Sequence, residues 1–381
     1  MVVLYTPGHN PYTDTLIMYG ILVPVLEKIE EFEDMVAEDI RITGHGGTYK
    51  IEIPGISVNT LADAVVDYVT KYPPSEIIRK LMEETSTLQK SVKNSLNAVL
   101  TLMGSINDVK QYLRDLEQVG HAARMRAGRT SQKGFVRAWL AISPTSGKFF
   151  QTFFKAQDKA YMMCRMCIGI ACIGLFSHAI LYGRGRTLII VPAFEGEVGG
   201  DAINGYFIDL RDKADDIAQL FKGVYDKIPE RVLSQIAIAQ LGNDVIKEFA
   251  EQEALWKVFS VVLEKGATQL RGFCEVDIDP LISGLYDLCM REGGKPIDDF
   301  RNLLKDIMKL LSMKYLGKTV RGRQISTDVD VLEKIFHFFG SRSAIDLYDL
   351  SRAVYLSAKD QNRSGFGDKL CKGLASLIRE Q

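Results

Sequence analysis

The sequence predicts an α+β protein, with a mixed N-terminal part and a predominantly helical C-terminal part, on three observations. A β-hairpin pattern with a small sheet lies early in the chain, apolar residues at helical spacing dominate after Lys213, and a strand-like run falls between them. The 381 residues are 46% hydrophobic and 25% charged, so the chain can bury a core. At roughly 150 residues per domain we expect two domains, residues 1–210 and 211–381.

The first residues predict a strand, a loop and a helix. Val2–Tyr5 is a short apolar run that suits a β-strand. A loop begins at Pro7, and Thr13 or Asp14 is the expected N-cap of a helix whose apolar residues continue to Ile29.

The next segment predicts a β-hairpin. Residues 40–43 and 48–53 flank a Gly-rich turn, and apolar and polar residues alternate in the second arm. This hairpin and its neighbours form the small sheet of the N-terminal part.

Helices are expected across residues 58–119, with a break at Pro73 and Pro74. After the break, residues 75–119 have apolar side chains on one helical face. We expect that face to pack on other helices or on a protein partner.

A helix is also predicted over residues 147–182, and it raises the question of a membrane. From Met166 to Gly183 no Asp, Glu, Lys or Arg occurs, which is the length of a short membrane span. The stretch nevertheless includes His178 and leads into a strand-like run, Thr187–Phe194. We therefore expect a buried central helix that feeds a buried strand, and no membrane partner.

Gly199, Gly200 and Gly205, which precede it, favour a further strand at Tyr206–Leu210. From Lys213 to the end, apolar residues recur at helical spacing, and Gly residues mark the turns between helices. No internal repeat of fixed period is found.

Positive charge is gathered in one part of the chain. The formal net charge is −1, yet residues 121–186 contain eleven Lys or Arg and a single acidic residue, Asp158. A stretch of one sign in a near-neutral chain attracts a polyanion. The alternative is that folding brings acidic surface from elsewhere beside these cations.

Three clusters, residues 124–139, 182–186 and 314–323, combine cations with Gly or hydroxyl residues, a composition that suits contacts with a nucleic-acid backbone. The first lies in a predicted basic loop, residues 121–137, where Phe135 and nearby Trp139 offer rings that either stack on a base or pack in the core. The second and third each contain Arg-Gly-Arg, whose guanidinium groups suit bidentate contacts. The candidate nucleic-acid-binding residues are Arg124, Arg126, Arg129, Lys133, Arg137, Lys148, Arg184, Arg186, Lys318, Arg321 and Arg323.

Sequence signatures of catalysis are absent. No GxxxxGK[ST], HExxH or GxSxG occurs, so we expect neither an enzyme nor a cofactor. The paired carboxylates Asp277/Asp279 and Asp328/Asp330 suit helix capping better than a divalent cation.

The cysteines are expected to be free thiols. The chain starts without a secretory signal, which predicts a reducing cytoplasm. Cys164 and Cys167 have CxxC spacing, but no second CxxC or nearby His pair completes a zinc site. Two buried thiols on a helix are therefore expected, with no metal.

The sequence resembles the large subunit of the type I-A CRISPR effector complex, the archaeal Cascade. The resemblance lies in the opening Tyr5–Asp14 segment (YTPGHNPYTD) with its following helix, in the Cys- and Gly-rich stretch 164–182 that leads into Leu188–Pro192, and in the C-terminal Asp349–Tyr355 (DLSRAVY). It covers most of the chain.

The resemblance implies a non-catalytic subunit of an RNA-guided antiviral complex. Such a subunit contacts crRNA and the backbone subunits, helps to recognise a motif in double-stranded target DNA, and helps to recruit the helicase-nuclease. No motif-reading side chain can be transferred to this sequence, so the candidate residues rest on charge and Gly context.

Two other functions are left open by the residues. The chain could be a helical scaffold or regulatory protein that docks an acidic protein through its basic loops. It could also be a metal-dependent nuclease that uses Asp277 and Asp279, and divalent-dependent cleavage lost in Asp277→Ala would indicate that activity.

Overall fold

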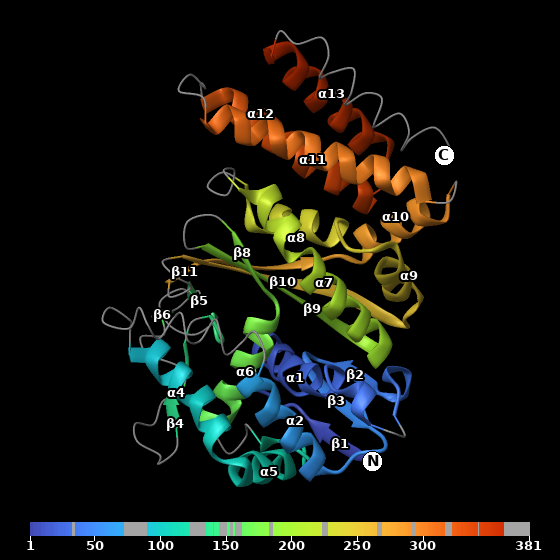
Figure 1. Ribbon diagram of the computed structural model, residues 1–381. Coiled ribbons are helices and arrows are strands. Elements are labelled where there is room, and N and C mark those ends of the chain that lie inside the picture. Colours follow the sequence, from blue (N-terminus) through green and yellow to red (C-terminus); the bar gives the residue numbers. More distant parts are fainter. Residues whose placement is uncertain are drawn as a thin grey trace. The chain divides into compact units, whose positions relative to one another are not determined.

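The structure is a computed structural model, shown in Figure 1, in which the chain divides into two compact units. Unit 1 comprises residues 1–179, 185–208 and 252–273, and unit 2 comprises residues 180–184, 209–251 and 274–381. The residues described are 1–32, 35–71, 90–121, 135–139, 141–144, 151–152, 155–156, 162–182, 186–222, 228–264, 269–291, 294–316, 322–341 and 343–361.

The predicted α+β class is confirmed. The strands are β1 (Val2–Tyr5), β2 (Arg41–His45), β3 (Thr48–Ile53), β4 (Phe135–Arg137), β5 (Gln151–Thr152), β6 (Lys155–Ala156), β7 (Met162–Cys164), β8 (Ala179–Tyr182), β9 (Arg186–Gly199), β10 (Ala254–Glu264) and β11 (Gln269–Asp277). The helices are α1 (Pro11–Leu26), α2 (Val58–Lys71), α4 (Lys90–Gly104), α5 (Ile106–Asp115), α6 (Arg165–Ser177), α7 (Gly200–Phe221), α8 (Glu230–Ala239), α9 (Asn243–Glu251), α10 (Asp279–Met290), α11 (Lys295–Leu316), α12 (Gly322–Ser341) and α13 (Ala344–Gln361).

An antiparallel sheet forms the frame of unit 1, with the strand order β1-β3-β2-β9-β10-β11. The predicted hairpin is confirmed as β2 and β3, in which Ile42 pairs with Ile51. The predicted strand at residues 187–194 is also confirmed, as the N-terminal part of the longer β9. Its partner β10 pairs with it antiparallel over ten residues.

The β10–β11 hairpin was not predicted, because the sequence after Lys213 was interpreted as helical. Strand β10 has an almost continuous run of buried residues, from Val258 to Leu263. A strand that is covered on both faces loses the period-two alternation by which a half-buried strand is found.

Helix α1 packs on this sheet through Tyr12. The Tyr12 ring makes edge contacts with Phe259 of β10 and Phe273 of β11, at 5.3 Å between ring centroids in both cases. Its hydroxyl donates a hydrogen bond to the carbonyl of Ala141 at 2.9 Å. The ring and the hydroxyl together fix the N-terminal end of α1.

The predicted N-cap of this helix is wrong. The helix begins at Pro11, and the side chain of Asn10 accepts a hydrogen bond from the backbone N–H of Thr13 at 3.0 Å. Proline suits the first helical position because its missing N–H would have no helical partner there. Asp14 instead accepts from the backbone N–H groups of Gly8 and Asn10, at 2.8 and 3.0 Å.

Helix α6 lies in the core of unit 1, between α1 and α4. Its residues from Cys167 to Phe176 are all buried. A Cβ atom added at Gly174 would lie 2.1 Å from the Leu16 carbonyl oxygen of α1, and one at Gly169 would lie 2.9 Å from the Leu102 side chain of α4. These glycines let α6 approach both neighbours more closely than any other residue would allow.

Helix α6 is shorter than predicted. It spans 13 residues, because Met162–Cys164 before it and Ala179–Tyr182 after it are strands. Among the residues that the structure describes, no helix is long and apolar enough to cross a membrane.

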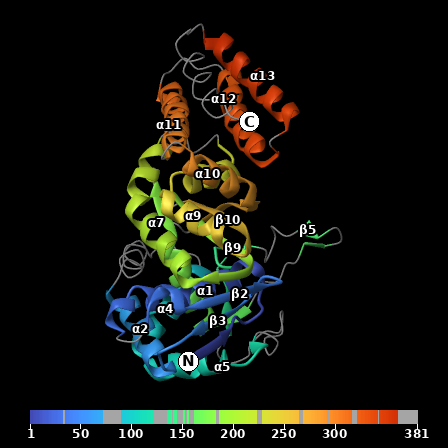
Figure 2. The same cartoon turned by 90° about the vertical axis from the view of Figure 1, so that its right-hand side faces the viewer.

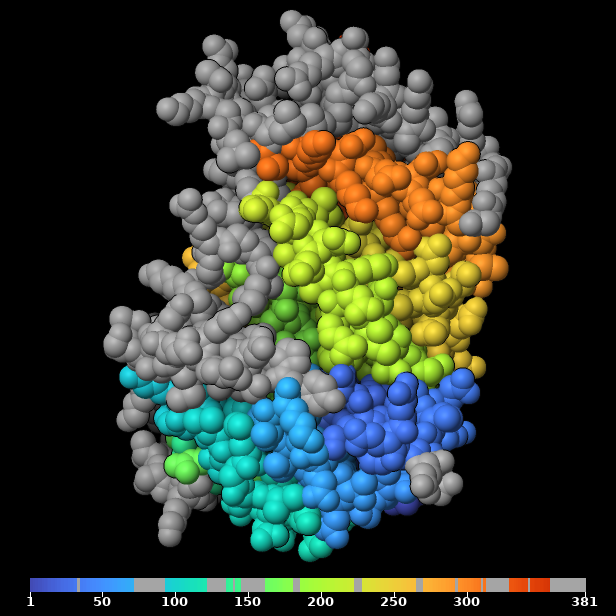
Figure 3. Space-filling model, viewed as in Figure 1, coloured from blue at the N-terminus to red at the C-terminus, as the bar shows by residue number. Residues whose placement is uncertain are grey.

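The remaining helices of unit 1 pack beside this core. Of the long helix predicted over residues 75–119, residues 90–104 form α4 and residues 106–115 form α5, and residues 75–89 lie outside the described part. Figure 3 shows α2, α4 and α5 side by side on one face of the unit, and contacts among all three helices agree with this view.

The strand predicted at Tyr206–Leu210 is wrong, because these residues lie inside α7. Ile203, Tyr206, Phe207 and Leu210 are buried, whereas Ile208 is 40% exposed. This three- and four-residue spacing is helical, and a short aromatic run does not distinguish the two structures.

Unit 2 is helical, as the sequence predicts. Arg301 of α11 donates to the Ala239 carbonyl oxygen at 2.9 Å and to the Asn243 side chain at 2.8 Å, and so ties α11 to the turn between α8 and α9. Figure 2 shows α12 and α13 lying side by side. Asp328 and Asp330 lie inside α12, so the helix cap predicted there is wrong.

Gly174→Ala tests the close approach of α1 and α6. The added methyl group overlaps the Leu16 carbonyl oxygen, so we expect the free energy of unfolding to fall by about 3 kcal/mol. Gly104→Ala is the matched control, because nothing lies within 4 Å of a Cβ atom at this end of α4. Denaturant unfolding compares the two, and equal stability in both variants would contradict the close approach.

Asp14→Asn tests a buried carboxyl group. Burial raises the pKa of Asp14 from 3.8 to about 6, although hydrogen bonds from Gly8 and its neighbours oppose the shift. The folded state therefore holds this proton more tightly than the unfolded state. The resulting stabilisation is complete below pH 3.8, is lost as the pH rises through 6, and is on the order of 3 kcal/mol.

The free energy of unfolding, measured at pH 4 and pH 7, should accordingly fall less steeply with pH in Asp14→Asn than in the unaltered protein. Asp108→Asn, at an exposed position of α5, is the control. Parallel pH profiles for the unaltered protein and Asp14→Asn would show that Asp14 is not buried as described.

Candidate nucleic-acid interface

Most of the predicted nucleic-acid-binding residues lie outside the described part of the chain. Only three fall within it, namely Arg137, Arg186 and Arg323. Those outside it are Arg124, Arg126, Arg129, Lys133, Lys148, Arg184, Lys318 and Arg321.

The three described candidates differ in their surroundings. Arg137 is exposed at the end of β4. Arg186 forms an ion pair with Glu264 at 2.7 Å, and its side chain is only 14% exposed. Arg323 lies in α12, but its side chain is not among the described ones. An exposed guanidinium such as that of Arg137 can reach a phosphate, whereas the charge of Arg186 is offset within unit 1.

The two candidate stacking rings also differ. Trp139 is buried, at 2% exposure, and packs near Phe176 with ring centroids 6.3 Å apart. Phe135, on β4, is half-buried. Core packing therefore accounts for Trp139.

The two ends of the basic segment, residues 122–134, converge on Cys164. On one side, His121 has its Nε2 atom 3.9 Å from the Cys164 sulfur. On the other side, Phe135 is the direct cross-strand partner of Cys164 in the pairing of β4 with β7. The segment thus starts and ends at one point of unit 1, and it has four Lys or Arg and no acidic residue.

Cys164 also defines the start of α6. It is the N-cap residue, and its sulfur accepts a hydrogen bond from the backbone N–H of Cys167 at 3.3 Å. The sulfur of Cys167 accepts a hydrogen bond from the Tyr112 hydroxyl at 3.4 Å. Both sulfurs of the CxxC pair are therefore held in place by donors from the protein.

The pKa values of the two thiols, Cys164 and Cys167, are shifted in opposite directions. Hydrogen bonding from Cys167, and then from His121, lowers the pKa of Cys164 to about 5, against the effect of burial. Burial raises the pKa of Cys167. Burial, with His121 as a second cause, lowers the pKa of His9 to about 3. Cys164 thus carries the thiolate near neutral pH, Cys167 keeps its proton, and His9 is neutral.

A small hollow is lined by residues that lead into the N-terminal end of the basic segment. It has a volume of about 300 Å³ and is lined by residues of the opening loop, of the β2–β3 hairpin and by Val119 and Gly120. Val119 is 79% exposed there, although it is apolar.

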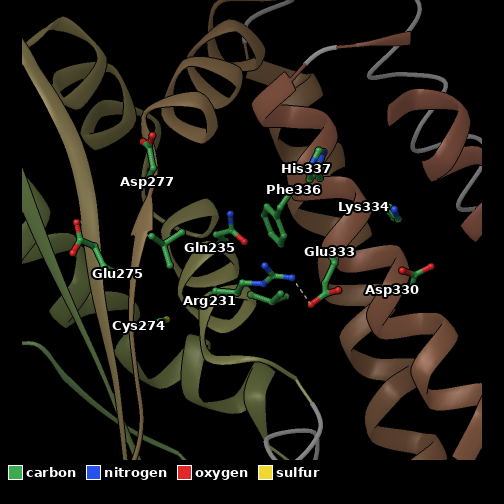
Figure 4. Close-up of a pocket in the computed structure, with 12 residues that line it drawn as sticks. Arg231, Gln235, Cys274, Glu275, Asp277, Asp330, Glu333, Lys334, Phe336 and His337 are labelled. Carbon is green, nitrogen blue, oxygen red and sulfur yellow. Dashed lines mark hydrogen bonds and ion pairs between the residues drawn. The ribbon is translucent and has the colours of Figure 1, made fainter. Parts of the chain in front are cut away.

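Unit 2 contains a larger pocket of about 460 Å³, shown in Figure 4, between β11, α8 and α12. Its charged lining residues are mostly acidic, and Arg231 forms an ion pair with Glu333 at 2.8 Å. Asp277 and Asp330 lie on opposite sides of it in Figure 4.

The pocket does not place its carboxylates as a metal site requires. Among the described residues, no three acidic groups have oxygen atoms close enough to share one cation. Asp277 instead accepts a hydrogen bond from the backbone N–H of Asp279 at 3.1 Å. The N-cap residue of α10 is Ile278, which makes no side-chain cap, so the capping predicted for Asp277 and Asp279 is wrong.

A comparison with known protein families identifies the family of the chain. A family model described as CRISPR-associated protein (Cas_Csa4) matches residues 2–381. The chain therefore belongs to this CRISPR-associated family. No curated protein matches the sequence.

Proposed function

We propose that this member of the CRISPR-associated family is a non-catalytic, nucleic-acid-binding subunit of an RNA-guided effector complex, the large subunit of a type I-A Cascade. The family membership supports the CRISPR-associated role. The resemblance described above supports the type and the position in the complex, and we propose a cytoplasmic location for it.

The observation that carries the proposal is the anchoring of the basic segment 122–134. Its ends are held at Cys164, by His121 on one side and by the β4–β7 pairing on the other. A segment with only positive charges and fixed ends suits a sugar-phosphate backbone, which presents a regular row of negative charges. Exposed Arg137, the last residue of β4, adds a further positive charge close behind the segment in sequence.

In this proposal the basic segment holds double-stranded target DNA, and the remaining chain, which is acidic in sum, faces proteins. Opposite charges favour association between subunits and steer their encounter. The partners would be crRNA, the backbone subunits and the helicase-nuclease. Phosphate contacts position the DNA.

Replacing Arg124, Arg126 and Arg129 together by Ala tests this function. Each lost phosphate contact flattens the dependence of log K on log salt concentration by about 0.9 for B-form DNA. If all three residues contact phosphates, the slope for duplex binding by the assembled complex should fall by about 2.7. Binding is measured across a salt series with the complex at fixed composition.

The matched control removes the same three charges elsewhere, from Lys222, Lys295 and Lys305 of unit 2, which are exposed. We expect this control to keep the slope of the unaltered complex. Equal slopes for both triple variants would reject segment 122–134 as the DNA contact. Retained duplex binding with an unchanged slope in the Arg variant would have the same meaning.

A further inference from the structure

Three side chains with metal-binding atoms meet at the base of the basic segment. The ligand atoms of His121, Cys164 and Cys167 all lie within 4.8 Å of one another. His121 precedes the segment, whereas the two cysteines belong to the end of β7 and the first turn of α6. Among the described residues, this is the only group of three or more potential ligands that close together.

We propose that His121, Cys164 and Cys167 bind a zinc-class divalent cation that clamps the base of segment 122–134. Two thiolates and one imidazole form a ligand set that zinc favours over magnesium or calcium. Three protein ligands leave one tetrahedral position, which a water molecule fills.

The distances suit this ion. Zinc–sulfur bonds of about 2.3 Å and zinc–nitrogen bonds of about 2.0 Å place sulfur and nitrogen roughly 3.6 Å apart in a tetrahedron. The distance from the Cys164 sulfur to His121 Nε2 is 3.9 Å. Small rotations of the side chains therefore bring all three atoms to bonding distance.

The surrounding groups hold the ligands in place. The backbone N–H of Cys167 donates to the Cys164 sulfur, and the Tyr112 hydroxyl donates to the Cys167 sulfur. The Tyr112 ring also meets the His121 ring edge-on, at 5.6 Å between centroids. Outer contacts of this kind orient the ligands of metal sites. On metal binding the thiol proton of Cys167 is released to solvent.

The clamp closes a long stretch of chain. His121 and Cys164 are 43 residues apart, and most of the positive charge of residues 121–186 lies between them. A metal bond across this gap fixes the path by which the chain enters and leaves the basic segment. This consequence rests on the proposed function, whereas the metal site itself does not.

Metal content is the direct test, and it needs no nucleic acid. The full chain is produced with added zinc, purified under reducing conditions and measured for zinc against protein. We expect about one zinc per chain, and below about a tenth of that in Cys164→Ser and in His121→Ala. Cys172→Ala, on the same helix but outside the ligand group, is the matched control and should keep the metal.

Cobalt substitution gives a readout that does not depend on variants. Co²⁺ added to the reduced, zinc-free chain should produce the near-ultraviolet band of thiolate–cobalt bonds and the visible bands of a tetrahedral site. Amide exchange at residues 135–137 and 162–164 should increase when a chelator removes the metal.

The proposal is overturned if the unaltered chain holds less than about a tenth of a zinc and shows no thiolate–cobalt band. It is also overturned if Cys164→Ser and His121→Ala both keep the metal content of the unaltered chain. A Cys164–Cys167 disulfide that, once reduced, takes up no cobalt would assign this pair to redox chemistry instead.

Discussion

The contact between α1 and α6 is the constraint on which the rest of unit 1 depends. A Cβ atom at Gly20 would lie 2.0 Å from the Ile170 carbonyl oxygen, so the two helix backbones touch where side chains normally intervene. Helix α1 is itself fixed to the sheet by Tyr12. The start of α6, and with it Cys164, is therefore placed by the packing of two buried helices and not by a surface loop.

The position of Cys164 matters for the positive charge of the chain, because the basic segment 122–134 begins and ends beside it. A chain with a formal net charge of −1 cannot attract nucleic acid as a whole, but it can do so locally if its cations are held together. The residues on both sides of segment 122–134, His121 and Phe135, are neighbours of Cys164. Arg186, in contrast, serves the sheet by pairing with Glu264 across adjacent strands.

Much of the frame could be predicted from the sequence, because the β2–β3 hairpin, the strand at residues 187–194 and the helical unit 2 have clear periodic patterns. The misassigned elements are those with weak patterns. Strand β10 is buried on both faces and lacks alternation, and Tyr206–Leu210 is too short to separate strand from helix.

Only part of the candidate site can be predicted from the sequence. The cations near Arg126 can be counted in the sequence. The contact between His121 and Cys164 cannot be predicted from it, because 43 residues separate the two. The available signal was the CxxC pair together with a histidine beside the basic segment. Only the fold of α5, β7 and α6 shows that these residues belong to one cluster, since sequence distance says nothing of spatial distance.

In the proposed function, segment 122–134 contacts nucleic acid directly. Photo-crosslinking of the assembled complex to duplex target DNA, followed by mass spectrometry of the linked peptides, tests it at the level of residues. We expect the linked peptides of this subunit to be concentrated in residues 122–137. Linked peptides found only in unit 2, or on other subunits alone, would contradict it.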